Sequence, residues 1–325
     1  MNPSYIIFLI IIIFIIGLII GIFINKKDPS DNTLTGSNNI SNNIDNFNNI
    51  DNLNNTDNSN NIINESNNIA IVSMMKNPKN IETWLEKHRN LGIYKFYIRL
   101  EDTPDLINYL QNQPDVDLII GQSNGTNEYT HIQVRQHDLV NTTLKKAMND
   151  NIKWLIQIDS DEVLDGNLDE IRNLPEKTRT FWMQNVEAVY DDIPTKEGNC
   201  FNAAYFKNCQ NASEKCVSYA NGKGGGRVAE DVEANGPHRF KSTLADNNEI
   251  KINMRVLHYE SCDYDLYKEK YIRLSKQDTK QDIPFPYYNE SINAAKIMAE
   301  DGNENMMKCI FKKYRTKNNE NIVCN

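Results

Sequence analysis

The sequence lacks two features that would point to a metal cluster or to nucleic acid. It contains no Cys-x-x-Cys pair, so a zinc cluster is not expected. Basic residues are not in excess, because 35 Lys and Arg residues stand against 44 Asp and Glu residues, and no nucleic-acid partner is predicted. The cysteines are even in number, which allows disulfides in a secretory lumen and equally allows buried thiols in the cytosol. They are Cys200, Cys209, Cys216, Cys262, Cys309 and Cys324.

Charge is absent from residues 5–24, an uninterrupted apolar run of mainly Ile, Leu, Phe and Gly. About 20 helical residues, each rising about 1.5 Å, span a bilayer core of about 30 Å. A cleaved signal peptide fits less well, because the run exceeds an h-region of roughly 7 to 15 residues and is followed by Lys26 and Lys27. We therefore expect residues 1–27 to form a single-pass transmembrane anchor.

The orientation of this anchor and its self-association are left open by the residues. Lys26 and Lys27 alone would leave the following domain in the cytosol by the positive-inside rule. Asn-x-Ser/Thr sequons, glycosylated only in a lumen, point the other way, although chance sequons are expected in so Asn-rich a chain. Gly17 and Gly21 would let two such helices form a homodimer, and glycines without a packing role are an equal alternative. The sequons include Asn124, Asn141, Asn211 and Asn289.

Aromatic residues are almost absent from residues 28–68, where Phe47 stands among Asn, Ile, Asp and Ser. Such a segment cannot bury enough apolar surface to offset its chain entropy, so we expect a disordered, Asn-rich stalk. Residues 69–325 are mixed in composition and long enough for one sizeable core. They form the predicted globular domain.

Strand and helix patterns alternate along the first part of this domain. Short apolar runs of strand length are separated by stretches with helical spacing of apolar residues. This order predicts an α/β fold with a mostly parallel sheet flanked by helices, and a ligand site beyond the carboxyl ends of the strands. The predicted strands are 69–75, 94–100, 116–120 and 154–158, and the predicted helices are 80–91, 104–111 and 131–149.

An acidic turn, Asp159-Ser-Asp161-Glu162, follows the fourth predicted strand. Two carboxylates leaving a buried strand at the ligand edge are costly to place together unless a cation shares them. Oxygen ligands of this kind suit Mn²⁺ or Mg²⁺, either of which bridges diphosphate oxygens. The turn predicts a divalent metal site, although solvated acidic turns are common.

Several short segments together are more specific than this Asp-x-Asp triplet, and they resemble the glycosyltransferase family 2-like and family 92 group. The resemblance covers residues 69–165 well and four later segments more loosely: Gly222-Lys223, Gly226-Arg227-Val228, residues 236–240 and Leu257-His258-Tyr259. The segments that carry it are Asn77-Pro78, Trp84-Leu85-Glu86-Lys87-His88, Leu91-Gly92, Phe96-Tyr97-Ile98 and the run from Trp154 to Glu162.

The resemblance implies a GT-A fold that transfers a sugar from a nucleotide diphosphate donor to a hydroxyl of a glycan or protein acceptor, with the domain in an ER- or Golgi-like lumen. It implies that Asp159, Asp161 and His258 hold the metal, with His238 as the competing histidine and a packed histidine as an equal alternative. Lys76, Asn77, Glu101, Asp102 and Asp159 are assigned to the nucleotide sugar, although a solvated loop start also accounts for Glu101 and Asp102. The catalytic candidates are Asp161, Glu187 and Asp231, and the general base is open among Glu187, Asp191, Glu230 and Asp231.

Two other functions compete with a glycosyltransferase. The strand followed by Asp159-Ser-Asp161 also matches the nucleophile motif of haloacid dehalogenase-type phosphohydrolases, which usually open their fold with that strand. A non-catalytic, membrane-displayed binding module is the third possibility. The glycine-rich run 221–227 has too many glycines for the interior of a helix or strand, so we expect a mobile lid or an anion-binding loop there.

Overall fold

The structure is a computed structural model that describes residues 68–123, 129–194, 198–202, 205–208, 221–244, 249–276, 285–317 and 322–324. The predicted anchor, the stalk up to residue 67, and the sequons at Asn124 and Asn211 lie outside the described residues. Among the residues that are described, none of the helices combines the length and the apolar character that crossing a bilayer requires.

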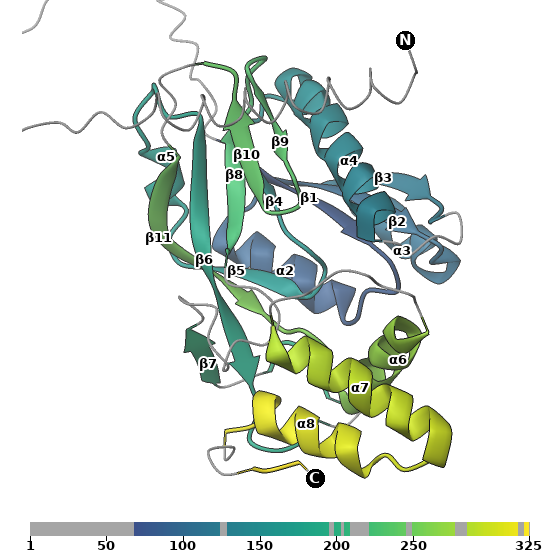
Figure 1. The fold of residues 1–325 in the computed structure, drawn as a ribbon. Helices are drawn as coiled ribbons and strands as arrows, with labels where there is room; N and C mark the ends of the chain where they lie inside the picture. Colours follow the sequence, from purple (N-terminus) through teal and green to yellow (C-terminus); the bar gives the residue numbers. More distant parts are fainter. Residues whose placement is uncertain are drawn as a thin grey trace, which may run out of the picture. The chain divides into compact units, whose positions relative to one another are not determined.

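A nine-stranded mixed sheet forms the centre of the domain (Figure 1). Its strand order is β3-β2-β1-β4-β8-β6-β11-β5, and β7 pairs with β6 beside this path. The strands are β1 (Ile69–Met75), β2 (Lys95–Glu101), β3 (Val116–Gly121), β4 (Trp154–Gln157), β5 (Glu162–Asp165), β6 (Thr180–Val189), β7 (Tyr205–Asn208), β8 (Lys223–Arg227) and β11 (Ile250–His258).

Most neighbours in this sheet run parallel. Strand β1 is parallel to β2 and β4, β2 is parallel to β3, and β6 is parallel to β11. Strand β8 runs antiparallel to both of its neighbours, β4 and β6, and β5 runs antiparallel to β11. The carboxyl ends of β1, β2, β4, β6 and β11 therefore share one edge with the amino end of β8.

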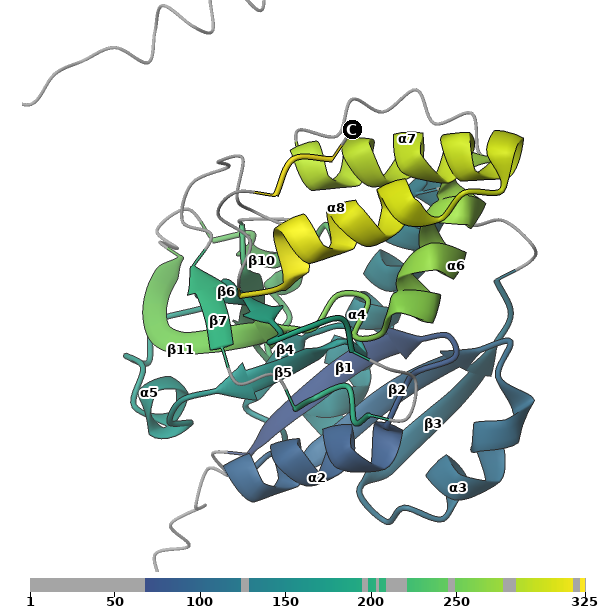
Figure 2. The same ribbon diagram turned by 90° about the horizontal axis from the view of Figure 1, so that it is seen from below.

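Helices cover both faces of the sheet, and three further helices form a separate layer (Figures 1 and 2). One core cluster joins α2 to the sheet through Trp84 and Leu85, and a second joins α4 to the other face through Leu139 and Leu144. A third cluster, rich in tyrosine, lies within α6, α7 and α8. The helices are α2 (Ile81–Leu91), the 3-10 turn η1 (Pro104–Leu106), α3 (Ile107–Gln111), α4 (Tyr129–Asn149), α5 (Asp169–Arg172), α6 (Tyr264–Ser275), α7 (Pro286–Asp301) and α8 (Asn305–Arg315), and a hairpin is formed by β9 (Val232–Asn235) and β10 (Arg239–Ser242).

The predicted α/β class and the first four strands with their helices are confirmed, and the sheet is of the Rossmann-like kind. The expectation for the glycine-rich run is wrong, because residues 223–227 form β8 in the middle of the sheet. Neighbouring groups explain why this strand is made of glycine. A Cβ on Gly225 would overlap the Phe181 ring, and a Cβ on Gly226 would overlap the Phe240 ring. These glycines make room for side chains packed against the strand instead of providing mobility.

Two disulfides lie in the described residues. Cys200 pairs with Cys262, just beyond β11, and Cys309 in α8 pairs with Cys324. Their Cα atoms are 5.0 Å and 5.7 Å apart. Both separations are in the usual range for a disulfide.

Candidate active site

The acidic turn lies at the shared edge of the sheet, as the strand pattern predicted. It leaves β4 at Ile158, whose N–H donates to the Val72 carbonyl, and it enters β5 at Glu162. Glu162 pairs in register with His258 of β11, and His258 pairs in register with Glu187 of β6. Three adjacent strands therefore bring a glutamate, a histidine and a glutamate side by side.

Side chains of helix α2 form hydrogen bonds with the chain directly after the acidic turn. The indole N–H of Trp84 donates to the Glu162 carbonyl at 2.7 Å, and the Leu164 N–H donates to His88 Nε2 at 3.1 Å. The other ring nitrogen of His88, Nδ1, must then donate to the Trp84 carbonyl at 2.8 Å. Burial lowers the pKa of His88 to about 3, so the ring is neutral and keeps this tautomer. The Trp and His of the helical motif therefore hold the turn in place.

Asp159 contacts a buried lysine from β8. Lys223 Nζ lies 2.5 Å from Asp159 Oδ2 and 3.3 Å from Glu162 Oε2, and the Gln136 amide donates to Asp159 Oδ1 at 3.2 Å. Burial opposes the lysine charge, but the charges of Asp159 and Glu162 outweigh it and raise the pKa of Lys223. Burial also raises the pKa of Glu162, to about 7. Lys223 thus compensates carboxylates that would otherwise repel each other.

Asp161 faces the histidine of β11. His258 Nε2 lies 3.6 Å from Asp161 Oδ2, and its Nδ1 lies 2.8 Å from Glu187 Oε2. Desolvation opposes the positive charge of His258. The charge of Glu187 and the hydrogen bonds to Glu187 and Asp161 outweigh this effect and raise the pKa of His258. Desolvation likewise opposes the Asp161 charge, and the hydrogen bond and charge of His258 lower the pKa of Asp161 below its ordinary range.

The chemistry of the Asp161–His258 pair fits a divalent cation. Neighbouring ligands of an octahedral ion with bonds of about 2.1 Å lie about 3 Å apart, and the observed separation of 3.6 Å is somewhat longer than this spacing. A carboxylate on the second ring nitrogen, here Glu187, is the usual companion of a metal-binding histidine. In the part of the chain that is described, no three His, Cys, Asp or Glu side chains are arranged to hold an ion. The fit is therefore to one carboxylate and one imidazole, which leaves the remaining ligand positions to substrate phosphates or water.

The residues assigned to the nucleotide divide into an exposed group and a buried one. Lys76 Nζ lies 2.9 Å from Asp102 Oδ2, Ser123 also donates to Asp102, and the Asn77 N–H donates to Thr103 Oγ1 at 2.8 Å. This group, at the carboxyl ends of β1, β2 and β3, is open to solvent on its Lys76 and Asp102 side. The hydrogen bond from Ser123 and the contact with Lys76 lower the pKa of Asp102 to about 2, so it is ionised at neutral pH.

Glu101 is buried, with only 2% of its side chain exposed. Its carboxylate accepts from Arg99 Nε at 2.9 Å and from Arg135 Nε at 2.9 Å. Both arginines come from inside the domain, one from β2 and one from α4. Glu101 is thus engaged within the protein, whereas its neighbour Asp102 presents a carboxylate at the surface.

The four carboxylates considered as general base are not together. Asp231 lies 3.3 Å from Arg179, which directly precedes β6, and Glu230 is its neighbour in the chain. Arg179 and Glu187 are eight residues apart along an extended strand, about 25 Å, so the structure places Asp231 far from the acidic turn. Glu187 is at the site but fully buried. Asp191, just beyond β6, is exposed at the ligand edge.

Two members of the site were not found by sequence reasoning. Gln136 carried no signal beyond its place in a predicted helix, and Lys223 was assigned to a loop because of the glycines around it. His238, the competing histidine, lies close by: its Nδ1 is 3.1 Å from the Gly222 carbonyl, and burial lowers its pKa.

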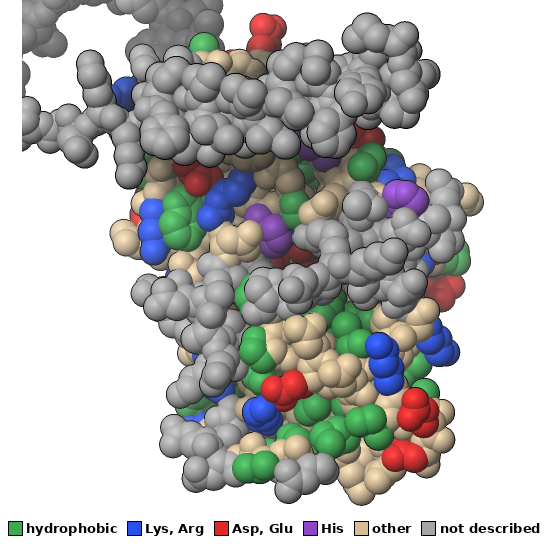
Figure 3. Space-filling model, in the orientation of Figure 1, with side chains coloured by type: hydrophobic (Ala, Val, Ile, Leu, Met, Phe, Trp, Pro, Cys, Tyr) green, Lys and Arg blue, Asp and Glu red, His purple; other side chains and the backbone are tan. Residues whose placement is uncertain are grey.

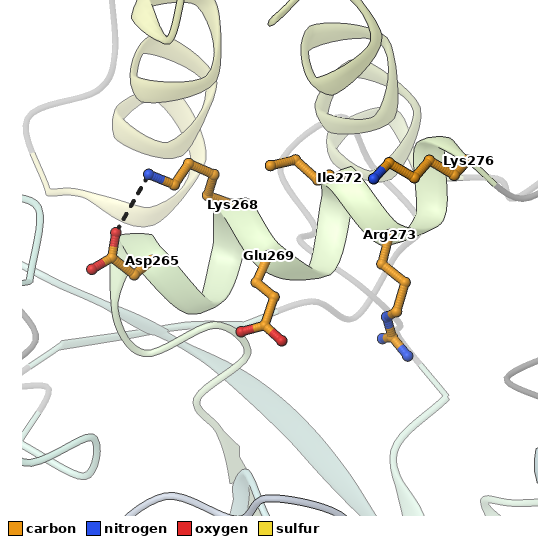
Figure 4. Close-up of a pocket in the computed structure, with 6 residues that line it drawn as sticks. All are labelled: Asp265, Lys268, Glu269, Ile272, Arg273 and Lys276. Carbon is orange, nitrogen blue, oxygen red and sulfur yellow. Dashed lines mark ion pairs between the residues drawn. The ribbon is translucent and has the colours of Figure 1, made fainter. Parts of the chain in front are cut away.

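Described residues away from the acidic turn line two cavities. One of about 220 Å³ lies beyond the carboxyl end of β6, where it is lined by Tyr190, Asp192, Pro194, Gly198, Asn199, Asn202 and Cys262. The other, of about 620 Å³, is lined, among the described residues, by α6 and by Lys276 just after it (Figure 4). These residues are mostly charged, and Lys268 forms an ion pair with Asp265.

Comparisons with known proteins support a glycosyltransferase-like relationship at low identity. The chain is similar to two Arabidopsis thaliana proteins named glycosyltransferase-like, 21% identical over 271 residues in one case and 21% over 287 residues in the other. The alignments cover 69% and 74% of this chain but only 53% and 64% of the relatives, so the chain spans about half to two thirds of their length. No model of a known protein family matches the sequence. Among solved structures, HddC from Yersinia pseudotuberculosis aligns at 10% identity over 62% of this chain and 96% of its own, with a TM-score of 0.28, which carries no weight here.

Proposed function

We propose that this chain is a metal-dependent glycosyltransferase with a GT-A type site, which moves a sugar from a nucleotide diphosphate donor to an acceptor hydroxyl. The observation that carries the proposal is the pairing of Asp161 with His258 at the carboxyl edge of a mostly parallel sheet, with Glu187 behind the histidine. The names of the two relatives support the same class of enzyme. The resemblance of residues 69–165 to the family 2-like and family 92 group adds to this support.

In this proposal each group at the edge has its own task. Asp161 and His258 hold Mn²⁺ or Mg²⁺, and the ion when bound offsets the charge that develops on the departing diphosphate. Lys223 and Gln136 fix Asp159 beside that position. At the ends of β1 to β3, Lys76, Asn77 and Asp102 bind the nucleotide, where the ionised Asp102 accepts hydrogen bonds from ribose hydroxyls or the base.

The acceptor hydroxyl needs a carboxylate that is ionised and reachable. Of the four that were considered, Asp191 combines exposure with a place at the ligand edge, whereas Glu187 is committed to His258. Asp191 also stands between Tyr190 and Asp192, two residues that line the cavity beyond β6. We assign the acceptor to this cavity and the proton transfer to Asp191.

The proposal includes a cellular compartment and a membrane topology. Residues 5–24 anchor the chain in a membrane, and the domain faces an oxidising lumen. The two disulfides support this side, because disulfides persist in oxidising compartments and are rare in the cytosol.

The test measures Mn²⁺ uptake and nucleotide diphosphate release by the purified full-length chain with a panel of nucleotide sugars. Asp161→Asn should abolish both, because it removes one of the two ligands, while Asp191→Asn should lower release and leave Mn²⁺ uptake intact. Asp169→Asn, an exposed carboxylate of α5, is the matched control and should behave as wild type. Unchanged release in Asp161→Asn would contradict the proposal. Phosphate release without any nucleotide sugar would favour the phosphohydrolase.

A further inference from the structure

Arg315, the last residue of α8, is buried directly behind the site. Its side chain is fully shielded from solvent, as is that of Glu187. The Arg315 guanidinium donates to Glu187 Oε2 at 3.4 Å through Nη1 and to the Glu260 carbonyl through Nη2. The Asn185 amide donates to the other carboxylate oxygen of Glu187 at 3.1 Å. Glu187 is therefore held from two sides while it accepts from His258.

The backbone around Arg315 is joined to β6 just past Glu187. The Tyr190 N–H donates to the Arg315 carbonyl at 2.8 Å, and the Lys317 N–H donates to the Tyr190 carbonyl at 2.8 Å. Tyr190 and Thr316 thereby form a parallel bridge. The end of α8 thus has a fixed position relative to the strand that carries Glu187.

Stability alone does not account for this buried ion pair. Replacing a buried salt bridge by apolar residues of similar volume is often neutral or stabilising, because desolvation offsets the Coulombic gain. The three C-terminal helices already pack through Tyr267, Tyr287 and Phe311, each with no exposed surface. On the outer surface of α7 and α8, acidic, basic and apolar side chains are interspersed (Figure 3). The charged pair instead lies where the end of α8 meets Glu187 of β6.

We propose that Arg315 is a positioning residue of the site: it fixes Glu187, which turns His258 so that Nε2 faces the metal position beside Asp161. This inference rests on the proposed function, since it concerns the same two metal ligands. It makes α8, the last of the described helices, a structural part of an active site whose other members come mainly from the central sheet and the turn after β4. Glu187 then acts through His258 and does not touch the acceptor.

Mn²⁺ affinity of the folded protein tests this inference. Mn²⁺ is titrated into the purified full-length chain in the presence of uridine diphosphate, and the free ion is followed by its EPR signal. Arg315→Lys keeps the charge but loses the fork that reaches both partners, and Glu187→Gln keeps the shape but loses the charge. Each should weaken Mn²⁺ binding about tenfold to a hundredfold. Lys313→Gln, on the surface of the same helix, is the control and should bind as wild type.

Thermal unfolding followed by circular dichroism shows that each variant is folded at the temperature of the titration. If Arg315→Lys does not fold, Arg315→Gln, which keeps a planar donor group, takes its place. Wild-type affinity in the Arg315 variant, together with loss of binding in Asp161→Asn, would overturn the inference and leave the proposed function standing. Absence of Mn²⁺ uptake in the wild type would overturn both.

Discussion

Protonation of His88 should release the acidic turn from α2, and its effect on stability can be worked out. The ring is fully buried, donates from Nδ1 to the Trp84 carbonyl and accepts the Leu164 N–H at Nε2. A protonated ring has no acceptor, so its Nε2–H would point at the Leu164 N–H, and two donors would face each other. The protonated ring would also place a charge in an apolar region. Lowering the pH should therefore destabilise the folded protein, and His88→Gln is the variant that removes the titrating group.

The expected magnitude follows from the two pKa values. In the unfolded chain His88 titrates near its ordinary pKa of about 6.5, and in the folded protein burial lowers this pKa to about 3. Between these values the unfolded state binds more protons, so the free energy of unfolding falls as the pH falls, by up to about 1.4 kcal/mol per pH unit. From about pH 7.5 to about pH 5, His88 should cost the folded state about 2 kcal/mol.

Denaturant unfolding of wild type and His88→Gln at both pH values measures this cost. The variant is expected to be less stable at neutral pH, because Gln does not reproduce both hydrogen bonds. Its stability should nevertheless fall less on acidification than that of the wild type, by about 2 kcal/mol. Other histidines titrate equally in both proteins and cancel in the difference. An identical pH dependence in the two proteins would show that His88 is not buried in its neutral form.

Two further predictions concern the sheet and the disulfides. Gly225→Ala should destabilise the domain by about 1–3 kcal/mol, because its Cβ would overlap the buried Phe181 ring, and a wild-type unfolding midpoint would contradict this packing. Peptide mapping of protein purified without reductant should recover Cys200 linked to Cys262 and Cys309 linked to Cys324, whereas free thiols at these positions would count against a lumenal domain.

The first half of the fold could be predicted from local patterns because each element carries its own signal there. The strand at Ile69–Met75 is apolar except for Ser73, and Gly92 ends α2 in the left-handed region. After Glu162 the local sequence pattern no longer predicts the observed strands. Strand β8 contains three consecutive glycines, which disfavour strands, and neighbours on other strands explain them, such as the rings of Phe181 on β6 and Phe240 on β10. A reason that lies on another strand is invisible to a local pattern.

In the candidate site, too, local signals were predictable from the sequence and partners from distant strands were not. Asp159, Asp161 and His258 were predicted from an acidic turn, a strand end and a family resemblance, and the structure brings them together at one edge. Their roles in binding metal and nucleotide stay predictions. The partner of each residue, Lys223 for Asp159 and Glu187 for His258, depends on strand register. Register between distant segments cannot be read from one sequence, so Asp231 was included although it lies at the opposite end of β6.

Strand β8 also has a consequence for how the chain reaches its native state. It is the only link, along the described strands, between the group β3-β2-β1-β4 and the group β6-β11-β5. During synthesis β4 is made well before β8, so its hydrogen-bonding edge has no native partner until residue 227 has emerged. An unpaired, apolar strand edge is a known route to aggregation, and pairing between distant segments is slow. Expression of this protein should therefore depend on chaperones that shield the growing sheet during translation.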